Sequence, residues 1–254
     1  MTWDPTVYMA FGNERTRPAL ELVARVPVDR PRLVVDLGCG TGNSTAALAQ
    51  RWPEARLIGV DSSPAMLAKA RASSVAAQWI QADIGAWTSP EPVSVIYSNA
   101  TFQWVDDHQP IFVRLLNSVE EGGALAVQMP RNFDAPSHVL LRETAAHGPW
   151  AGVTARLARP HPVCEPYEYY DLLAAHARRV DIWETEYLQV LEGEDAVFNW
   201  VSGTALVPYH DALAGALRED FMAAYRARLS QAYPRGADGS TLFPFKRIFI
   251  LAQR

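Results

Sequence analysis

A glycine-rich segment near residue 40 offers the clearest chemistry in this chain. It reads Asp-Leu-Gly-Cys-Gly-Thr-Gly over residues 36–42. Glycines let a backbone turn sharply and let a ligand lie against it. The spacing Gly-x-Gly-x-Gly, followed by Asn43, differs from the Gly-x-Gly-x-x-Gly of dinucleotide-binding enzymes. The segment is not a Walker loop either, because no Gly-Lys-Ser/Thr follows it.

Asp36 sets the sign of the charge that this segment would accept. A carboxylate directly before the loop is unfavourable beside a pyrophosphate. It suits a cationic ligand instead, such as the ammonium and sulfonium groups of S-adenosylmethionine. The alternative is an ordinary glycine-rich turn that follows an aspartate, since short motifs of this kind also occur without function.

Polar residues also follow the next predicted strands. Asp61 ends the second strand, where a carboxylate can accept both hydroxyls of a ribose, although an aspartate here would also suit the start of a helix. Asp83 ends the third strand, and with Ile84 it could bond and cover an adenine ring. Asn99 and Ala100 follow the fourth strand. The carboxyl ends of parallel strands meet at one edge of a sheet, so these positions predict a single ligand crevice.

The elements that would position these residues alternate between strand and helix as far as residue 129. Apolar runs predict strands at 33–37, 56–60, 77–81, 93–97 and 124–128. Helical patterns precede and separate them at 16–26, 43–52, after Ser63 and Pro64, and at 110–119. This order predicts right-handed βαβ units in an α/β fold with a Rossmann-like, mostly parallel sheet.

The alternation of predicted strands and helices ends after residue 129. Two mostly helical excursions are expected, and strands at 181–191 and 243–252 could pair as an antiparallel edge hairpin. We therefore expect a single domain over residues 1–254, with a sheet core at about 30–129, 180–192 and 241–254. The excursions, at about 130–179 and 193–240, would form a mainly helical cap.

Composition narrows the range of partners. The chain of 254 residues has a formal net charge of −5, so it lacks the global basic field of a nucleic-acid-binding protein. An anionic substrate would need a local basic pocket. The two cysteines, Cys39 and Cys164, are not at metal-ligand spacing, and no metal is expected. With no leader pattern and no run long enough to span a bilayer, we expect a cytoplasmic protein that binds no membrane.

Longer strings carry a resemblance to a known family. They occupy residues 3–18, 62–67, 98–104, 126–130, 180–185 and 245–250. Together with the glycine segment they resemble, nearly end to end, the trans-aconitate 2-methyltransferase family of the class I methyltransferase superfamily. The resemblance implies S-adenosylmethionine as cofactor. It also implies methyl transfer to a carboxylate of a small polycarboxylic acid, trans-aconitate, giving a monomethyl ester and S-adenosylhomocysteine.

The resemblance and the strand ends together give two sets of candidate residues. The cofactor set is Arg15, Asp36, Gly38, Gly40, Asp61, Ser62, Met66, Asp83, Ile84, Asn99 and Ala100. The acceptor set is Tyr8, Gln103, Trp104, Arg131, His138, Tyr170, Tyr209 and Arg247, with Tyr169 and Lys246 as further candidates; Trp87 could line either the cofactor or the acceptor pocket. Arg15 is expected to pair with the methionyl carboxylate. Neighbours in a strand point to opposite faces, so only one of Lys246 and Arg247 can face the pocket, and Arg247 is preferred. Arg15 could instead be a surface helix arginine, and each candidate in the predicted cap could serve only to cover apolar surface.

Carboxylate methylation needs little acid–base chemistry, because the nucleophile is already an anion at neutral pH. We therefore name no catalytic residue and expect the enzyme mainly to align the acid and exclude water. Three alternatives stay open. They are methylation of a hydroxyl, amine or carbon acceptor, a non-catalytic nucleotide-binding module, and an NAD dehydrogenase, against which Asp36 and Asn43 count.

Overall fold

The computed structural model describes residues 16–158 and 161–254, which form two compact units. Unit 1 takes in the described residues up to Pro130, together with Val163–Glu184 and Ile248–Arg254. Unit 2 takes in Arg131–Pro162 and Thr185–Arg247. Two long strands, β6 (Arg179–Glu192) and β7 (Ser240–Gln253), belong partly to each unit.

Seven strands form one mixed sheet in the order β3-β2-β1-β4-β5-β7-β6. The first five are β1 (Leu33–Leu37), β2 (Arg56–Asp61), β3 (Gln78–Gln81), β4 (Val93–Asn99) and β5 (Val119–Pro130). They pair in parallel with one another. β7 runs antiparallel to β5, since Gly122 N–H donates to Arg254 O at 3.0 Å and Arg254 N–H donates to Gly123 O at 3.2 Å. This confirms the expected mostly parallel sheet with an antiparallel edge.

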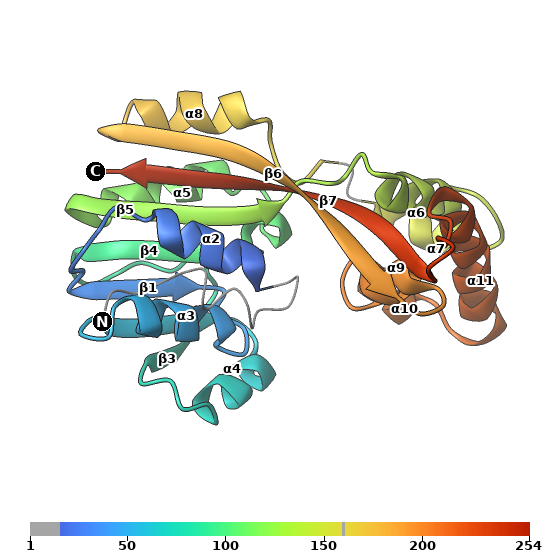
Figure 1. The fold of residues 1–254 in the computed structure, drawn as a ribbon, viewed down its shortest axis with the longest axis horizontal. Coiled ribbons are helices and arrows are strands. Elements are labelled where there is room, and N and C mark those ends of the chain that lie inside the picture. Colours follow the sequence, from blue (N-terminus) through green and yellow to red (C-terminus); the bar gives the residue numbers. More distant parts are fainter. Residues whose placement is uncertain (1–15, 159–160) are drawn as a thin grey trace. The chain divides into compact units, whose positions relative to one another are not determined.

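Helices cover both faces of the sheet in unit 1. α2 (Arg17–Arg25) and α3 (Asn43–Arg51) lie on one face, and α5 (Gln109–Asn117) lies on the other (Figure 1). α4 (Pro64–Arg71) begins at Ser63, whose Oγ accepts the Met66 N–H at 3.3 Å. α8 (Pro166–Ala174) packs against α5. Because both faces are covered, all five residues of β1 are buried.

The start of β5 differs from the prediction. The strand begins at Val119, whereas the sequence suggested residue 124. The pairing with β4 is irregular here, with Val93 opposite Val119 and Val95 opposite Ala124. Gly122, at φ +78°, occupies this bulge. Gly122 and Gly123, which lie between the predicted helix at 110–119 and the predicted strand at 124–128, therefore belong to an irregular strand.

Unit 2 has an apolar core of its own. Its helices are α6 (Pro136–Ala146), α7 (Ala151–Thr154), α9 (Ala196–Ser202), α10 (Val207–Ala212) and α11 (Gly215–Ala232). The core includes Leu141, Trp150, Phe221 and Tyr225 from this helical part and Phe243 from β7. Short 3-10 turns occur at Phe102–Trp104 (η1) in unit 1 and Ala155–Leu157 (η2) in unit 2. In the described part of the chain no helix combines the length and apolar character needed to cross a membrane.

Candidate active site

The loop after β1 folds back onto the end of β2. Gly38 and Cys39 N–H groups donate to Val60 O at 2.7 and 3.1 Å. Gly38 has φ +74°, and a Cβ there would overlap the Thr101 side chain. Gly40 also has a positive φ, +55°, but a Cβ on it would meet nothing within 4 Å. The loop therefore leaves open space at Gly40, as a backbone that cradles a ligand must.

Asp36 is buried, and within the described chain only one of its two carboxylate oxygens accepts hydrogen bonds. It lies in β1 and is 1% exposed. Ser44 and Thr45 hydroxyls, from the first turn of α3, donate to its Oδ2 at 2.7 and 2.6 Å. Oδ1 has no hydrogen-bond partner among the described residues. Burial raises the Asp36 pKa from 3.8 to about 6, against the opposing effect of the two hydroxyls, so the group is an anion at neutral pH.

Asp61, the last residue of β2, holds the glycine loop. Its Oδ2 accepts the Gly40 N–H at 2.9 Å, and its Oδ1 accepts the N–H of Ser63, the residue that caps α4, at 2.8 Å. The helix-start role considered for this residue is therefore present. A carboxylate offers about four acceptor positions, so capacity remains for ribose hydroxyls.

The end of β4 presents two more acceptor oxygens. Ala100 has φ +54°, and its N–H donates to Gln128 O at 2.9 Å, which fixes the turn after the strand. Gln103 Nε2 donates to Ala100 O at 2.7 Å. Within the described chain, Asn99 Oδ1 and Gln103 Oε1 are buried without a hydrogen-bond partner. With Asp36 Oδ1, these atoms give adjacent strand ends an acceptor-rich character that fits a cation carrying N–H groups.

The loop after β3 is held by a side chain from α5, which lies far from it in the sequence. Ile84 and Trp87 are buried, whereas Asp83 is exposed and accepts the Gly85 N–H at 2.9 Å. The Arg114 guanidinium, on α5, donates to the carbonyls of Gly85 and Trp87. Sequence reasoning missed Arg114, because nothing in the local pattern connects it with this loop. It also missed Ser44 and Thr45, whose only signal is their place in the helix turn after the glycines.

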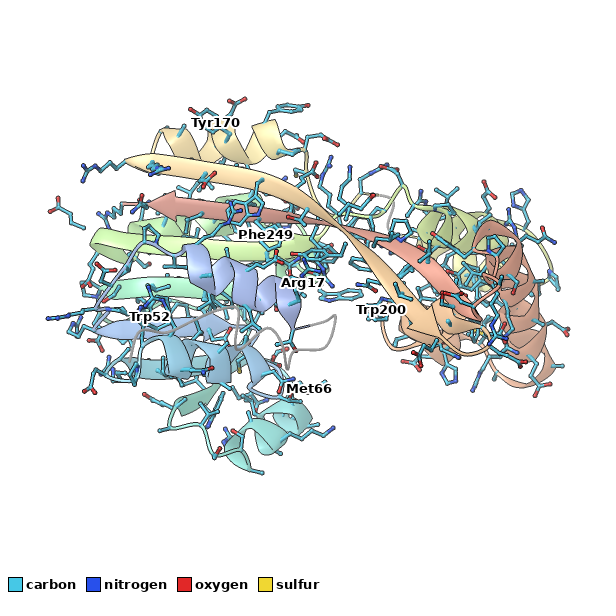
Figure 2. All side chains as sticks on the ribbon, in the orientation of Figure 1. Arg17, Trp52, Met66, Tyr170, Trp200 and Phe249 are labelled. Atoms are coloured by element: carbon cyan, nitrogen blue, oxygen red, sulfur yellow. The ribbon has the colours of Figure 1, made fainter. Side chains whose placement is uncertain are left out.

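Other predicted residues of unit 1 fall in different surroundings. Met66 and Trp104 are exposed at 43% and 51%, and Ser62 is also exposed. Tyr170 is 52% exposed on α8, well away from Met66 (Figure 2). Its neighbour Tyr169 belongs to the core, where its hydroxyl lies 2.6 Å from His108 Nε2. Tyr169 therefore packs in the core beside α5, whereas Tyr170 lies on the surface of α8. Arg15 and Tyr8 lie outside the described residues.

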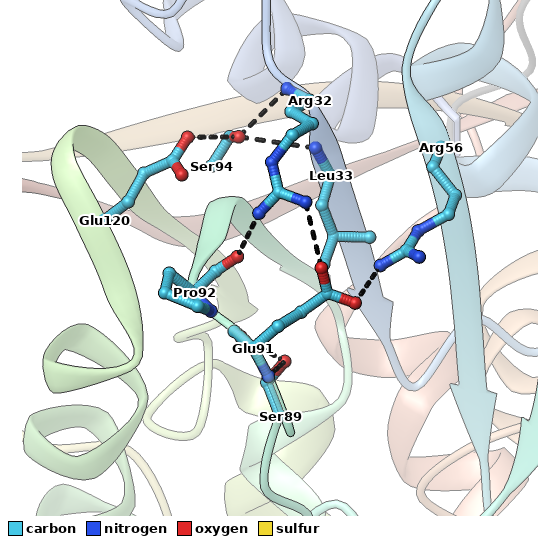
Figure 3. A network of polar contacts seen from close by, with 8 residues as sticks. All are labelled: Arg32, Leu33, Arg56, Ser89, Glu91, Pro92, Ser94 and Glu120. Atoms are coloured by element: carbon cyan, nitrogen blue, oxygen red, sulfur yellow. Dashed lines mark hydrogen bonds and ion pairs between the residues drawn. The ribbon is translucent and has the colours of Figure 1, made fainter.

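Charged side chains gather at the opposite, amino ends of the strands as well, but there they bond one another. Glu91 accepts from Arg32 Nη1 at 2.9 Å and also from Arg56 (Figure 3). Ser94 Oγ accepts the Arg32 N–H at 2.9 Å and donates to Glu120. Because these charges pair with one another, we assign the network a structural role. Exposed ion pairs of this kind add only modestly to stability.

Comparison with known proteins identifies the family. Residues 34–123 match the Methyltransferase domain family. Over its full length the chain is 49% identical to the trans-aconitate 2-methyltransferase of Azoarcus sp. (strain BH72), with 100% of this chain and 99% of the relative covered. The enzyme of the same name from Acidovorax ebreus (strain TPSY) is 47% identical, covering 99% and 98%.

The chain belongs to the trans-aconitate 2-methyltransferase family. It is an S-adenosylmethionine-dependent methyltransferase, as its sequence predicted. The strand ends fit that cofactor, because Asp36 is an anion whose Oδ1 has no partner among the described residues, and the space at Gly40 is open, as a sulfonium and ammonium ligand requires.

Solved structures show the same fold. The YcgJ protein from Bacillus subtilis superposes with a TM-score of 0.60 at 13% identity, covering 93% of this chain and 98% of that one. Phosphoethanolamine N-methyltransferase 2 from Haemonchus contortus, in complex with S-adenosyl-L-methionine, gives 0.55 at 13% identity, covering 98% and 56%. At such identities the likeness concerns the fold alone.

Four predicted acceptor residues, Arg131, His138, Tyr209 and Arg247, belong to unit 2. Arg247 is 5% exposed. Burial, reinforced by Arg142, lowers the His138 pKa to about 4, so this residue is neutral at neutral pH and offers a hydrogen bond instead of a charge. Tyr209 is buried and stacks on Phe221, with ring centroids 5.5 Å apart.

Proposed function

We propose that this chain transfers the methyl group of S-adenosylmethionine to a carboxylate of trans-aconitate, giving the monomethyl ester and S-adenosylhomocysteine. One observation carries the proposal. Relatives named trans-aconitate 2-methyltransferase match the chain from end to end at 49% and 47% identity. A match over the whole chain includes the described residues of unit 2 as well as the glycine loop, so it extends beyond the elements of the general methyltransferase fold.

The residues of unit 1 would bind and orient the donor. When bound, the cofactor supplies an electrophilic methyl group on a sulfonium centre. In this proposal Asp36 balances the positive charge, Asp61 accepts from the ribose, and Ile84 covers the adenine. The backbone at Gly40 lies against the ligand, held in place by its N–H bond to Asp61 at 2.9 Å.

The acceptor needs no general base in this reaction. A carboxylic acid with a pKa near 4 is ionised at neutral pH. The chain has only to place the carboxylate in line with the methyl group and to exclude water, which is a matter of alignment and desolvation. Trp104, in the turn after β4, is proposed to contribute to this alignment.

A methyl-transfer assay across a panel of acceptors tests the proposal. Purified protein would be incubated with S-adenosylmethionine and one of trans-aconitate, cis-aconitate, citrate, succinate, or representative hydroxyl and amine compounds. S-adenosylhomocysteine would be quantified, and the product mass would be measured. We expect the highest kcat/KM and a monomethyl ester with trans-aconitate. Turnover only with a hydroxyl or amine acceptor would overturn the proposed substrate, and absence of turnover across the panel would overturn the activity.

A further inference from the structure

The Asn132 side chain of unit 2 is a buried amide with no hydrogen bond to any other described residue. It is 4% exposed, and in the described part of the chain neither Oδ1 nor Nδ2 has a partner. Its position is fixed by its neighbour, because Arg131 N–H donates to Lys246 O of β7 at 2.9 Å. Buried polar groups in folded proteins are normally bonded, so this amide calls for a partner that the described residues do not supply.

A second such amide lies on β6. Gln189 is 3% exposed, and both its Oε1 and its Nε2 lack partners among the described residues. The strand alternates here, with Tyr187 and Gln189 buried while Leu188 and Val190 are 59% and 55% exposed. Because successive side chains of a strand point to opposite faces, Gln189 belongs to the buried face of the strand pair.

Arg247 shares that buried face. On β7, Phe243, Phe245 and Arg247 are buried, whereas Leu242 is 51% exposed. The Arg247 guanidinium lies 4.5 Å from the centre of the Phe245 ring, and Trp200 packs against the same phenylalanine with ring centroids 6.2 Å apart. An aromatic face holds a guanidinium in a fixed plane, which suits paired hydrogen bonds to a carboxylate.

Asn132 joins this face by register. The bond from Arg131 to Lys246 places the next residue, Asn132, beside Phe245. Side chains alternate from one residue to the next, which is consistent with a half-buried Arg131 and a buried Asn132. Two unbonded amides and one buried guanidinium therefore share one side of the strands in unit 2.

We propose that Asn132, Gln189 and Arg247 form the carboxylate-recognition site that selects the acid acceptor. The inference rests on the proposed function and names the groups that bind the acid. Amide N–H groups and a guanidinium are donors, whereas a polycarboxylate offers acceptor oxygens. Arg247 binds one carboxylate that does not react, and the amides donate to the remaining oxygens. Neutral amides add donors without the desolvation penalty of further charges.

Leucine substitutions separate this role from a structural one. Asn132→Leu and Gln189→Leu keep the approximate size of the side chain and remove its polar atoms. Replacing an unbonded buried amide by an apolar group should leave Tm unchanged or raise it. We expect the Kd of trans-aconitate to rise about tenfold to a hundredfold in each variant, as for loss of a hydrogen bond to a charged group. The Kd of S-adenosylhomocysteine should not change.

The measurement is calorimetric titration of trans-aconitate into the full chain saturated with S-adenosylhomocysteine. Asn199→Leu is the matched control, since Asn199 is exposed on α9 and its Nδ2 already donates to Glu194 O at 3.0 Å. It should bind the acid as the wild type does. Asn132→Asp retains the shape but adds a negative charge, so it should weaken acid binding more than leucine does. Gln189→Leu tests the site independently if Asn132→Leu fails to fold.

Binding and ester formation fail independently of each other. If the wild type binds trans-aconitate but forms no ester, the proposed function is wrong while the recognition site stands. If ester forms, and folded Asn132 and Gln189 variants bind the acid as tightly as the wild type, the recognition site is overturned. Absence of trans-aconitate binding to the wild type would overturn both.

Discussion

Replacing Asp36 by asparagine should stabilise the fold and weaken donor binding at the same time. The carboxylate is 1% exposed, and its burial raises its pKa from 3.8 to about 6. One pKa unit corresponds to about 1.4 kcal/mol, so the ionised group costs the folded protein about 3 kcal/mol at neutral pH. An asparagine keeps one oxygen for the Ser44 and Thr45 hydroxyls but adds an amide without a partner. A buried amide without a partner costs about 1–3 kcal/mol, so the net gain should lie between about 0 and 2 kcal/mol.

The pH dependence of this gain has a definite sign. Between pH 3.8 and about 6 the folded protein retains a proton on Asp36 that the unfolded chain has released. The contribution of this group to stability therefore falls as pH rises through that window and stays constant above it. An asparagine side chain does not titrate, so the variant lacks this dependence. The stability of Asp36→Asn relative to the wild type should be highest above about pH 6 and about 3 kcal/mol lower below about pH 4, as measured by urea denaturation across that range.

Donor affinity should change in the opposite direction. Losing the charge opposite the cation should weaken S-adenosylmethionine by about 1.5–3 kcal/mol, or roughly 10- to 150-fold in Kd. Glu91→Gln is the control, because this exposed carboxylate lies at the amino ends of the same strands and should leave Kd unchanged (Figure 3). A destabilised Asp36→Asn variant with normal affinity would refute the reasoning and make Asp36 a structural residue of the loop.

Three further predictions concern the loop and the reaction. Gly40→Val should lower the affinity for S-adenosylmethionine at least about tenfold. Gly122 has a similar positive φ and equally open surroundings, so Gly122→Val should add comparable strain of about 1–2 kcal/mol without affecting binding. Equal affinities of the two variants in calorimetry would exclude a ligand at Gly40. Asp61→Ala should weaken the binding of S-adenosylmethionine by about 1.5–3 kcal/mol. It should also lower Tm, because the N–H groups of Gly40 and Ser63 lose their acceptor. A lower Tm with unchanged affinity would leave Asp61 only its structural role. The rate at saturating substrates should be nearly constant from about pH 6 to 9, since an acid with a pKa near 4 is ionised throughout this range. If methyl transfer limits the rate and the rate nevertheless rises log-linearly with pH, a proton is being removed. The acceptor would then be a hydroxyl or an amine.

The sequence predicts most of unit 1 because its signals are local. A buried apolar run, a turn of glycines and a capped helix each lie within a few residues, and the strands of the parallel sheet fall close to their expected places. β5 is the exception. Its early part contains Gly122 and Gly123, which read locally as a helix end and a turn, and only the pairing with β4 shows that they lie in a bulged strand.

Contacts between residues far apart in the sequence limit how much of the donor site can be predicted. Asp36 and Gly40 are evident from the motif, yet the groups that position them are not. Arg114 reaches the loop after β3 from α5 through two backbone carbonyls. No periodicity or short motif encodes such a contact, because it depends on how the helix packs. Tyr169 and Tyr170 show the same limit, since adjacent aromatic residues on one helix look alike until burial separates them.

Acceptor recognition is harder to predict, because its signal is the absence of a bond. In sequence, an asparagine after a strand or a glutamine within one suggests a turn or an exposed face. Only the folded chain shows that Asn132 and Gln189 are buried while their polar atoms lack partners among the described residues. Keeping two such amides inside a small unit opposes stability, whereas leucine at either place would not. Retaining a group that opposes stability is reasonable if a ligand satisfies it. This is why we assign the choice of acid to the amides together with Arg247, the basic residue favoured from sequence.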